Sequence, residues 1–538
     1  MKVESIGFSS AIQVQTKFLP DYPYDIQLIA NNDISLTNGD MLTFSFYVRC
    51  VSSGTGMVEF VVEEREKPYK KILRYFTNPG KEWAKSKILI AIPESYDPGD
   101  IRFCFRLGAK IQTIEIGGVE FINYGKVLPD EILVNHFYSY DVSDQNTEWR
   151  ELAQNRIDSV RKTDFSVLVK DMNSRPIEKA TVIIEMTRHK FRFGTAVSSH
   201  YITNDITKDA VIYRQKVKEL FDYVVFESDL KWKEWENIQR RKNTLKAVQW
   251  LNENNIEIRG HCLVWPWWKK VPTDIRKNKN DPSYIRDKVK DHIVDIVTEL
   301  NGIVQEWDVI NEPVTHHELT DITGEGSVSE WFEMVKHINP NIDTYVNDYG
   351  ILNHGGVDII HQQKSYKYID RLLQEGVRLD GIGIQSHFNW QLTPIQNVLD
   401  ILGTFSKFHK KILITEFDVN VFDEILQADY VRDFMTACFS HPSVDGIYMW
   451  GFWDGRHYRN NAPVYRKDWS MKPSGKVWYD LVYNKWWTND TGTTNDKGVY
   501  STRGFLGTYY IKVIKDGKTV IREVELNSGG LILEIVVE

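Results

Sequence analysis

The stretch "IVQEWDVINE", residues 303–312, is a short apolar segment that ends in an amide and a carboxylate, Asn311 and Glu312. An apolar run of this length, followed at once by Pro313, is typical of a buried strand that stops where it reaches the surface. An amide beside a carboxylate at that point predicts a chemical site. Acid–base chemistry there needs a second carboxylate, which must come from another part of the chain.

Seven other apolar segments share this pattern, and each is followed by a segment of helical periodicity such as "DAVIYRQKVKELF" or "EWFEMVKHI". They are "FRFGTAV" (191–197), "YVVFES" (223–228), "IEIRGHCLVW" (256–265), "DTYVNDY" (343–349), "GIGIQSH" (381–387), "ILITEFDV" (412–419) and "GIYMWGFWD" (446–454). Eight strand-then-helix units over roughly 300 residues predict a (β/α)8 barrel, the TIM-barrel fold.

The chain of 538 residues is too long for a single hydrophobic core. Its beginning contains short strand-like runs separated by turn signals, which is typical of an all-β sandwich. Its last part is strand-like again and contains a Lys-Asp-Gly-Lys hairpin signal. We therefore predict a multidomain protein with four parts: a β-sandwich (1–125), a connecting helix and strands (126–186), the catalytic barrel (187–487) and a small C-terminal β appendage (488–538).

The composition excludes several kinds of partner. A net charge of −8 and a pI near 6.0 argue against nucleic acid or an anionic membrane, because both need a basic surface. No apolar run reaches the length of a transmembrane helix. The four cysteines form no Cys-x-x-Cys or Cys/His cluster, so we expect neither a metal nor a cofactor. Cys50 and Cys104 are candidates for a disulfide, which the sequence leaves open.

The N-terminal "MKVESIGFSS" lacks the apolar core of a signal peptide. The sequence is therefore either a mature form with an added Met or a cytoplasmic protein. We expect a secreted or periplasmic protein whose signal peptide is absent from this sequence.

The active site of such a barrel lies at the carboxyl ends of its strands. Polar and aromatic residues stand at seven of the eight predicted strand ends: Glu227, Lys231 and Trp232; His261 and Trp265; Asn311 and Glu312; Asn347, Asp348 and Tyr349; Gln385 and His387; Glu416 and Asp418; Trp450, Trp453 and Asp454. One polar strand end is ordinarily a solvated loop residue, but so many on one rim predict a site. Glu416 is the second carboxylate, because strands four and seven lie across the barrel and let two side chains face one ligand.

Two opposed carboxylates beside aromatic platforms suit glycoside hydrolysis. One carboxyl must be protonated to assist the leaving group, and the other must stay ionised to attack the anomeric carbon. The predicted first strand does not end in His-x-His, which a metal-dependent hydrolase on this fold often shows.

The motifs "WDVINEP" and "ITEFDV" resemble the acid/base and nucleophile motifs of glycoside hydrolase family 10, the β-1,4-xylanases. Further matches follow the order and spacing of that family: "FGTAVS" (193–198), "RGHCLVW" (259–265), "VNDYG" (346–350), "GIGIQSHF" (381–388) and "WGFWD" (450–454). The chain departs from the family pattern at Ser228, where Asn is usual, at Pro266, where His is usual, and at Tyr458, where Trp is usual. These departures leave the preferred substrate open.

The resemblance implies that Glu312 is the acid/base and Glu416 the nucleophile. It also implies that Asn311 binds the sugar 2-hydroxyl, and that Asp418 orients His387 so that His387 contacts the nucleophile. The other substrate-binding residues that it implies are Glu227, Lys231, His261, Trp265, Tyr349, Gln385, Trp450 and Tyr458. Simple structural roles remain open for some of them: Trp265 and Trp450 as core, His387 as a satisfied structural histidine, and Glu227 with Lys231 as a rim ion pair.

We therefore predict a retaining endo-β-1,4-xylanase that acts on xylan or xylo-oligosaccharides. A β-1,4-glucanase, an exo-acting β-xylosidase and a catalytically silent carbohydrate-binding protein are the alternatives. The sequence does not predict an oligomeric state. The N-terminal sandwich weakly resembles carbohydrate-binding modules. The basic loop that contains Arg456 and Arg459 either reads an acidic substituent of the substrate or forms salt bridges with nearby acids.

Overall fold

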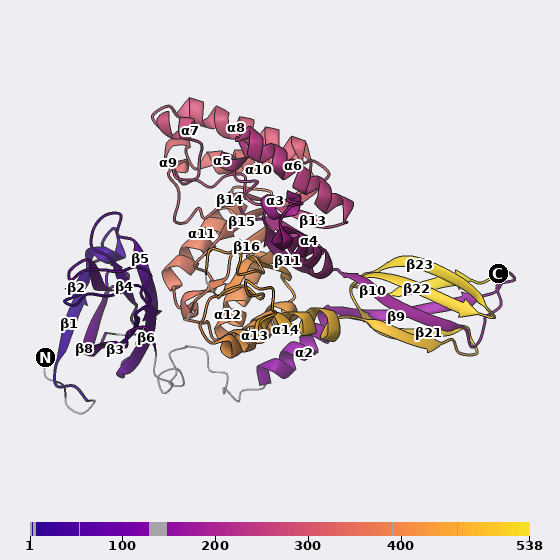
Figure 1. Ribbon diagram of the computed structural model, residues 1–538, viewed down its shortest axis with the longest axis horizontal. Helices are drawn as coiled ribbons and strands as arrows, with labels where there is room; N and C mark the ends of the chain where they lie inside the picture. The colour runs from indigo at the N-terminus through magenta and orange to yellow at the C-terminus, as the bar shows by residue number, and fades with distance from the viewer. Residues whose placement is uncertain (1–2, 4–6, 53, 128–147, 390, 460) are drawn as a thin grey trace. The chain divides into compact units, whose positions relative to one another are not determined.

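The computed structural model describes residues 3, 7–52, 54–127, 148–389, 391–459 and 461–538. Part of the predicted connecting segment, residues 128–147, lies outside these described residues. The chain divides into two compact units: residues 1–141, 352–362 and 388–394 form one, and residues 142–351, 363–387 and 395–538 form the other. Figure 1 labels many of the elements of both units.

The first unit contains a sandwich of two antiparallel four-stranded sheets, as the short alternating runs predict. One sheet has the order β1-β8-β3-β6 and the other β2-β7-β4-β5, with a 3-10 turn η1 (Pro23–Asp25) beside them. The strands are β1 (Ala11–Thr16), β2 (Gln27–Asn31), β3 (Met41–Cys50), β4 (Val58–Glu64), β5 (Lys71–Thr77), β6 (Ala84–Ala91), β7 (Ile101–Arg106) and β8 (Gln112–Asn123). Phenylalanines from both sheets, including Phe44, Phe46 and Phe60, fill the space between them.

The second unit contains the predicted barrel. Its eight strands are β11 (Arg192–Val197), β12 (Tyr223–Phe226), β13 (Glu257–Gly260), β14 (Val304–Asn311), β15 (Asp343–Asp348), β16 (Gly381–Ile384), β18 (Lys411–Val419) and β19 (Val444–Met449). Each strand pairs in parallel with both neighbours, and the pairings of β16 with β18 and of β19 with β11 close the ring. A two-residue strand, β17 (His387–Phe388), lies beside β18. The structure confirms the TIM-barrel prediction.

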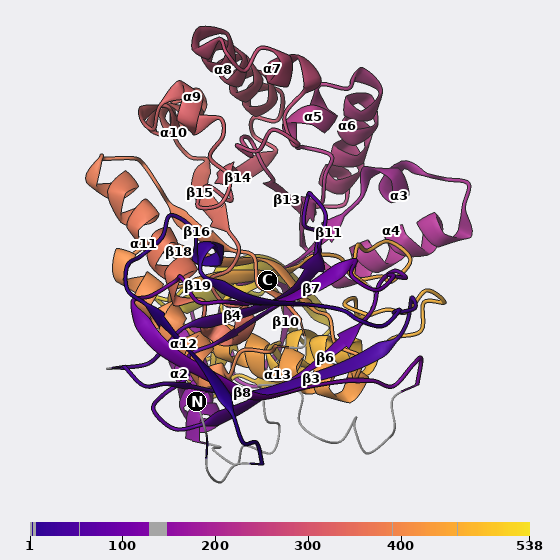
Figure 2. The ribbon, with the colours of Figure 1, turned by 90° about the vertical axis from the view of Figure 1, so that its left-hand side faces the viewer.

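Helices follow the strands, as the periodicity predicts. They are α3 (Ser199–Thr203), α4 (Lys208–Leu220), α5 (Trp232–Trp235), α6 (Ile238–Glu253), α7 (Thr273–Lys277), α8 (Pro282–Glu299), α9 (Thr320–Thr323), α10 (Gly326–Ile338), α11 (Ile359–Gln374), α12 (Ile395–Phe405), α13 (Glu424–Ser440) and α14 (Pro473–Asp480). Short helical turns, η2 (His354–Gly356), η3 (Ser406–Phe408) and η4 (Leu481–Lys485), complete the set. Figure 2 shows α4, α6, α8, α10 and α11 spread in an arc around strands β11–β16.

A layer of buried charges lies inside the barrel. Arg259 on β13 pairs with Asp308 and Glu306 on β14, and Arg192 on β11 pairs with Glu306 at 2.5 Å. Arg259 and Asp308 have 1% exposed side chains, so each charge depends on its partner for compensation. The ion pairs of this layer join the three strands β11, β13 and β14. Asp308 also contacts His261, one of the predicted site residues.

The C-terminal strands do not stand alone. Strands β9 (Lys162–Lys170) and β10 (Thr181–His189), which we expected in a connecting segment, pair with the strands that follow the barrel. The resulting sheets are β20-β10-β22-β23 and β21-β9-β24, where the later strands are β20 (Asn489–Thr493), β21 (Val499–Phe505), β22 (Gly507–Lys515), β23 (Lys518–Leu526) and β24 (Leu531–Val536). Pairing between segments some 300 residues apart leaves no local signal, so sequence periodicity finds these strands but not their partners.

The predicted hairpin in this C-terminal β module (162–189 and 489–536) is present. Lys515 pairs with Lys518, and Asp516 and Gly517 between them have φ angles of 48° and 80°. Two consecutive left-handed residues are what a tight two-residue hairpin turn requires. Before this module, helix α2 (Glu148–Val160) is tied to the barrel by Arg150, which pairs with Asp433 on α13.

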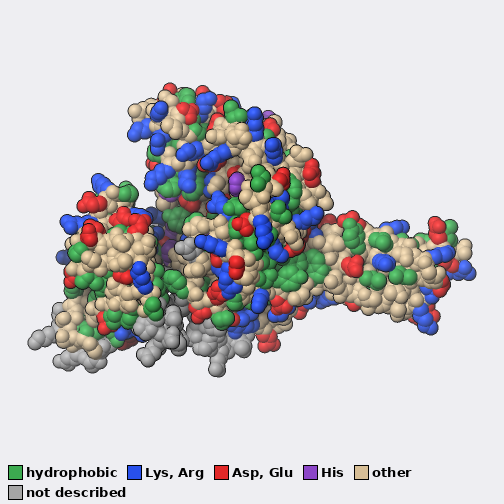
Figure 3. Space-filling view, viewed as in Figure 1, with side chains coloured by type: hydrophobic (Ala, Val, Ile, Leu, Met, Phe, Trp, Pro, Cys, Tyr) green, Lys and Arg blue, Asp and Glu red, His purple; other side chains and the backbone are tan. Residues whose placement is uncertain are grey.

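The composition led to expectations about membrane-spanning helices, surface charge and cysteines. None of the helices in the described part of the chain has the length and apolar character needed to cross a membrane. Lys and Arg are interspersed with Asp and Glu on the face drawn in Figure 3. Cys50 and Cys104 are buried and free in the described residues, so the disulfide that the sequence left open is not formed there.

Candidate active site

The two predicted carboxylates stand at the carboxyl ends of β14 and β18, three strands apart around the closed ring. Glu312 follows the last residue of β14 and has a left-handed backbone, with φ of 54°. Its backbone N–H donates to the carbonyl of Asn347 at 2.8 Å, which holds this unusual conformation in place. A non-glycine residue with positive φ is a strained position of the kind found at functional sites.

Three amides connect the two carboxylates. Gln385 Nε2 donates to Glu312 Oε1 at 2.9 Å and lies 3.5 Å from Asn311 Oδ1. Asn347 Nδ2 donates to both Asn311 Oδ1, at 2.9 Å, and Glu416 Oε1, at 2.8 Å. Asn311 Nδ2 is buried and has no hydrogen-bond partner among the described residues, which leaves a donor for a ligand hydroxyl.

The side chains around Glu416 favour its ionised form. Burial alone would raise the pKa of Glu416, but the hydrogen bond from His387 and the positive charges of His387, His261 and Lys231 outweigh it and lower that pKa. His387 Nε2 lies 3.1 Å from Glu416 Oε2, and His387 Nδ1 lies 2.8 Å from Asp418 Oδ2. Burial would lower the pKa of His387, yet Asp418 and Glu416 together raise it to about 9.

The surroundings of Glu312 favour its protonated form. Burial raises the pKa of Glu312 to about 7; the hydrogen bond from Gln385 opposes this shift, and the negative charges of Glu416 and Asp348 add to it. The pKa values of the two carboxyl groups are therefore moved in opposite directions. Two carboxyl groups separated in this way can act as acid and base in the same pH range.

Other predicted binding residues surround this pair. His261 Nδ1 and Asp308 Oδ2 form a hydrogen bond of 2.8 Å, and this contact fixes the orientation of the imidazole ring. Trp450 lies edge-on to both His261 and His387, at centroid distances of 5.2 and 6.2 Å. The ammonium of Lys231 lies over the rings of Trp265, at 5.0 Å, and Trp450, at 5.7 Å. The structure therefore brings these side chains to one rim.

The remaining candidates lie at the edge of the same rim. Glu227 pairs with Arg456 at 2.8 Å, and Tyr349 shares a hydrogen bond of 2.9 Å with Thr315. Tyr458 is 55% exposed and its hydroxyl lies 3.2 Å from His387 Nδ1. The rim pair that we considered for Glu227 and Lys231 is instead a pair of Glu227 with Arg456.

The two arginines Arg456 and Arg459 of the basic loop are paired with carboxylates. Besides the pair of Arg456 with Glu227, Arg459 donates to Asp418 Oδ1 at 3.2 Å. These contacts agree with the salt-bridged alternative. Burial alone would raise the pKa of Asp418, but the positive charges of Arg459 and His387 outweigh it and lower that pKa.

Sequence reasoning missed His316 in this site and left the partners of Asn347 and Arg459 open. Asn347 was visible only as one polar strand end among many, although it bridges Asn311 and Glu416. Arg459 comes from a loop whose conformation no periodicity reports. His316 lies four residues after Glu312, and its Nε2 is 3.6 Å from Glu312 Oε2; that spacing was the one signal available.

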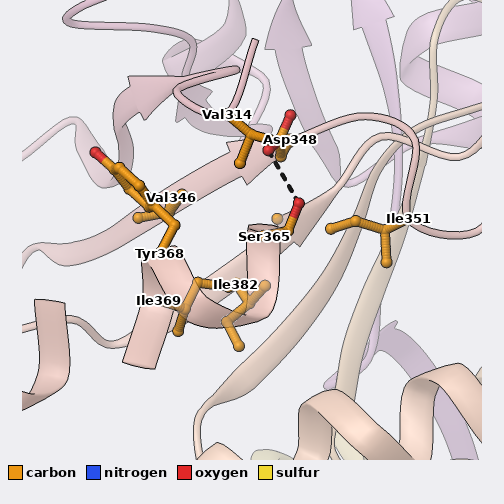
Figure 4. Close-up of a pocket in the computed structure, with 9 residues that line it drawn as sticks. Val314, Val346, Asp348, Ile351, Ser365, Tyr368, Ile369 and Ile382 are labelled. Carbon is orange, nitrogen blue, oxygen red and sulfur yellow. Dashed lines mark hydrogen bonds between the residues drawn. The ribbon is translucent and has the colours of Figure 1, made fainter. Parts of the chain in front are cut away.

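A pocket lined mainly by residues of β15, β16 and α11 is too tight to hold a ligand. Figure 4 shows its apolar lining, including Val314, Val346 and Tyr368, and the hydrogen bond of 3.2 Å from Ser365 to Asp348. It has no room for a water molecule, so we assign it to packing rather than to substrate binding. Within the described residues, no group of three or more His, Cys, Asp or Glu side chains is placed to hold a metal ion.

Comparison with known proteins identifies the family of the chain. Residues 183–482 match the family model of glycosyl hydrolase family 10, which is more than half of the chain. The chain therefore belongs to glycosyl hydrolase family 10.

Named relatives share only part of their length with this chain. The anti-sigma-I factor RsgI6 of Acetivibrio thermocellus is 32% identical over 69% of this chain and 47% of its own length. Endo-1,4-beta-xylanases 1 and 3 of Arabidopsis thaliana are 29% and 28% identical over 66% and 71% of this chain, and over 37% and 50% of their own lengths. The chain thus spans half or less of the length of these relatives.

Solved structures support the fold. Xylanase 10B from Thermotoga petrophila, in complex with xylobiose, is 24% identical and has a TM-score of 0.50, with 55% of this chain and 95% of that chain covered. Native xylanase 10B from Thermotoga maritima has the same identity and TM-score.

Proposed function

We propose that the protein is a retaining endo-β-1,4-xylanase that hydrolyses xylan or xylo-oligosaccharides. The observation that carries this proposal is the pair of carboxyl groups on one rim whose pKa values are shifted in opposite directions, Glu312 upward and Glu416 downward. Membership of the family and the names of the A. thaliana relatives support the substrate class.

In the first half of the reaction, Glu416 attacks the anomeric carbon and Glu312 gives its proton to the departing sugar oxygen. His387 holds Glu416 ionised through the hydrogen bond at 3.1 Å, and Asp418 holds the charge of His387. The unpaired Nδ2 of Asn311 donates to the sugar 2-hydroxyl, a contact that strengthens as positive charge grows on the sugar ring.

In the second half, Glu312 is a carboxylate and removes a proton from a water molecule, which attacks the glycosyl-Glu416 ester. The product has the same anomeric configuration as the substrate, because two inversions occur at one carbon. Lys231, His261 and Trp450 bind the sugar that remains on the enzyme. A polymeric substrate that stays outside the cell favours a secreted or periplasmic location.

The test separates the two carboxylates. Glu416→Ala removes nearly all turnover on every substrate, because no covalent intermediate forms. Glu312→Ala also abolishes xylan hydrolysis, but an aryl xyloside with a good leaving group still glycosylates Glu416, and added azide restores turnover with a β-glycosyl azide as product.

NMR of the first product released by the wild type should show the β-anomer. An α-anomer would contradict the retaining mechanism. Activity on cellulose in place of xylan would favour the glucanase, release of single xylose units would favour the exo-acting xylosidase, and binding without hydrolysis would favour the silent carbohydrate-binding protein.

A further inference from the structure

The two oxygens of Glu312 have different surroundings. Oε1 accepts the hydrogen bond from Gln385 Nε2 at 2.9 Å. Oε2 has His316 Nε2 at 3.6 Å. Because Oε1 is held by Gln385, Oε2 is the oxygen left to meet the scissile bond, so His316 lies beside the oxygen that carries the transferable proton.

The ring of His316 is held in one orientation. The backbone N–H of His316 donates to the carbonyl of Glu312 at 2.9 Å, which places both side chains on one turn. The ring stacks on Trp267 with centroids 4.3 Å apart and planes at 15°. Its other nitrogen, Nδ1, is 4.0 Å from Glu318 Oε2, farther than Nε2 is from Glu312 Oε2, so we assign the single proton of the neutral ring to Nε2. The stacking thus turns the Nε2 edge toward Glu312.

The charged groups around the two side chains come from several elements. Burial lowers the pKa of His316 to about 4; Asp348 opposes this shift, and His317, Lys270 and Lys269 add to it. At neutral pH the imidazole is therefore uncharged and carries one ring proton. The groups that face this pair are Glu318 and His317 on the same segment, Asp348 on β15, Lys269 and Lys270 after β13, Lys231 after β12, and Glu416 on β18.

We propose that His316 is a positioning residue whose Nε2–H donates a hydrogen bond to Oε2 of Glu312 once that carboxyl has given its proton to the departing sugar oxygen. This role rests on the proposed function of Glu312. The proton passes from Glu312 to the leaving oxygen as the bond from that oxygen to the anomeric carbon breaks, and the imidazole keeps its own proton throughout. When Glu312 takes a proton from water in the second half, the contact relaxes to its original length.

The contact favours catalysis because it strengthens as charge develops. A protonated carboxyl gains little from a donor at 3.6 Å, whereas a carboxylate draws that donor into a short, charge-assisted hydrogen bond. An interaction that is stronger in the transition state than in the ground state lowers the barrier. The effect is largest for leaving groups that need full protonation.

The test uses three variants. His316→Phe keeps the ring on Trp267 but has no donor, and His316→Gln restores an N–H near the position of Nε2. The matched control is His317→Phe, because His317 is the next residue, has a 59% exposed side chain and pairs with Asp321 on the surface. Titration of the Glu312 carboxyl, followed by carbon-13 NMR in the full chain, should give a pKa about one unit higher in His316→Phe and near the wild-type value in His316→Gln.

A purely structural role predicts a different sign. Loss of shielding alone would admit water and lower the pKa of Glu312. In parallel, kcat/KM of His316→Phe on xylo-oligosaccharides should fall roughly threefold to tenfold, and on a dinitrophenyl xylobioside by less than about twofold. The role of His316 would be overturned if the pKa of Glu312 in His316→Phe were unchanged or lower, or if kcat/KM fell equally on both substrates. Wild-type protein without hydrolytic activity would overturn the proposed function, which the NMR titration does not require.

Discussion

Among single residues, His387 makes the unfolding free energy depend on pH, because its charge is stabilised in the folded site. Its pKa is raised from about 6.5 to about 9 in the folded protein. A raised pKa contributes stability that is fully present below pH 6.5, roughly the unfolded-state value, and is lost as pH rises through the folded value. We expect the difference in unfolding free energy between the wild type and His387→Gln to shrink between about pH 6.5 and about pH 9, the limits set by these two values, as measured by urea unfolding.

The control for this prediction is His317→Gln, since the side chain of His317 is 59% exposed and lies on the surface. Its difference from the wild type should change little over the same range. A pH-independent difference for His387→Gln would contradict the account of the His387 charge.

At the scale of elements, the barrel depends on its layer of buried charges. Arg259 compensates Asp308 and Glu306 from a neighbouring strand. Arg259→Met leaves these two buried carboxylates short of positive charge, and breaking such a pair costs about 3–5 kcal/mol. Thermal unfolding followed by tryptophan fluorescence reports on this unit, because all tryptophans except Trp83 and Trp149 lie between residues 232 and 487.

Arg240→Met is the matched variant, because Arg240 has a 61% exposed side chain and pairs loosely with Glu234, at 3.5 Å. Its effect should be within about 0.5 kcal/mol, as for most exposed pairs. Equal losses in the two variants would show that the buried layer does not stabilise the barrel.

The sequence predicted each strand of the barrel, because most of these strands are short and largely apolar, although the predicted range for β13 (256–265) is longer than the observed Glu257–Gly260. Predicted and observed ranges for β14 are 303–312 and Val304–Asn311. The pairing of β9 and β10 with strands beyond the barrel was not predictable from a local pattern. In the site, strand ends revealed both carboxylates, but the contact of Arg459 with Asp418 depends on a loop conformation that neither apolar periodicity nor turn signals determine.

In the molecule as a whole, the N-terminal sandwich carries an exposed pair of stacked aromatic side chains. Tyr22 and Tyr24 stack at 5.0 Å with planes at 6°, and they are 56% and 43% exposed. Tyr75, another aromatic residue of this domain, packs against the core. We propose that the sandwich binds polysaccharide through the Tyr22 and Tyr24 pair, while the catalytic candidates lie in the other unit.

The double variant Tyr22→Ala, Tyr24→Ala should weaken binding to insoluble xylan and spare hydrolysis of short soluble xylo-oligosaccharides. Tyr75→Phe, which keeps the packed ring, is the control. Deletion of residues 1–125 should have the same selective effect. Unchanged adsorption to xylan in pull-down measurements with both altered proteins would rule out a binding role for this domain.

The C-terminal β module is split around the barrel, and this has a consequence for synthesis on the ribosome. Strands β9 and β10 are made before the barrel, but their partners β20–β24 emerge only after it. During the translation of roughly 300 intervening residues, at about 5–20 residues per second, β9 and β10 wait with unpaired edges. The barrel therefore has time to fold first and to bring the two halves of the module together. A nascent chain released before residue 489 would expose those edges to other chains.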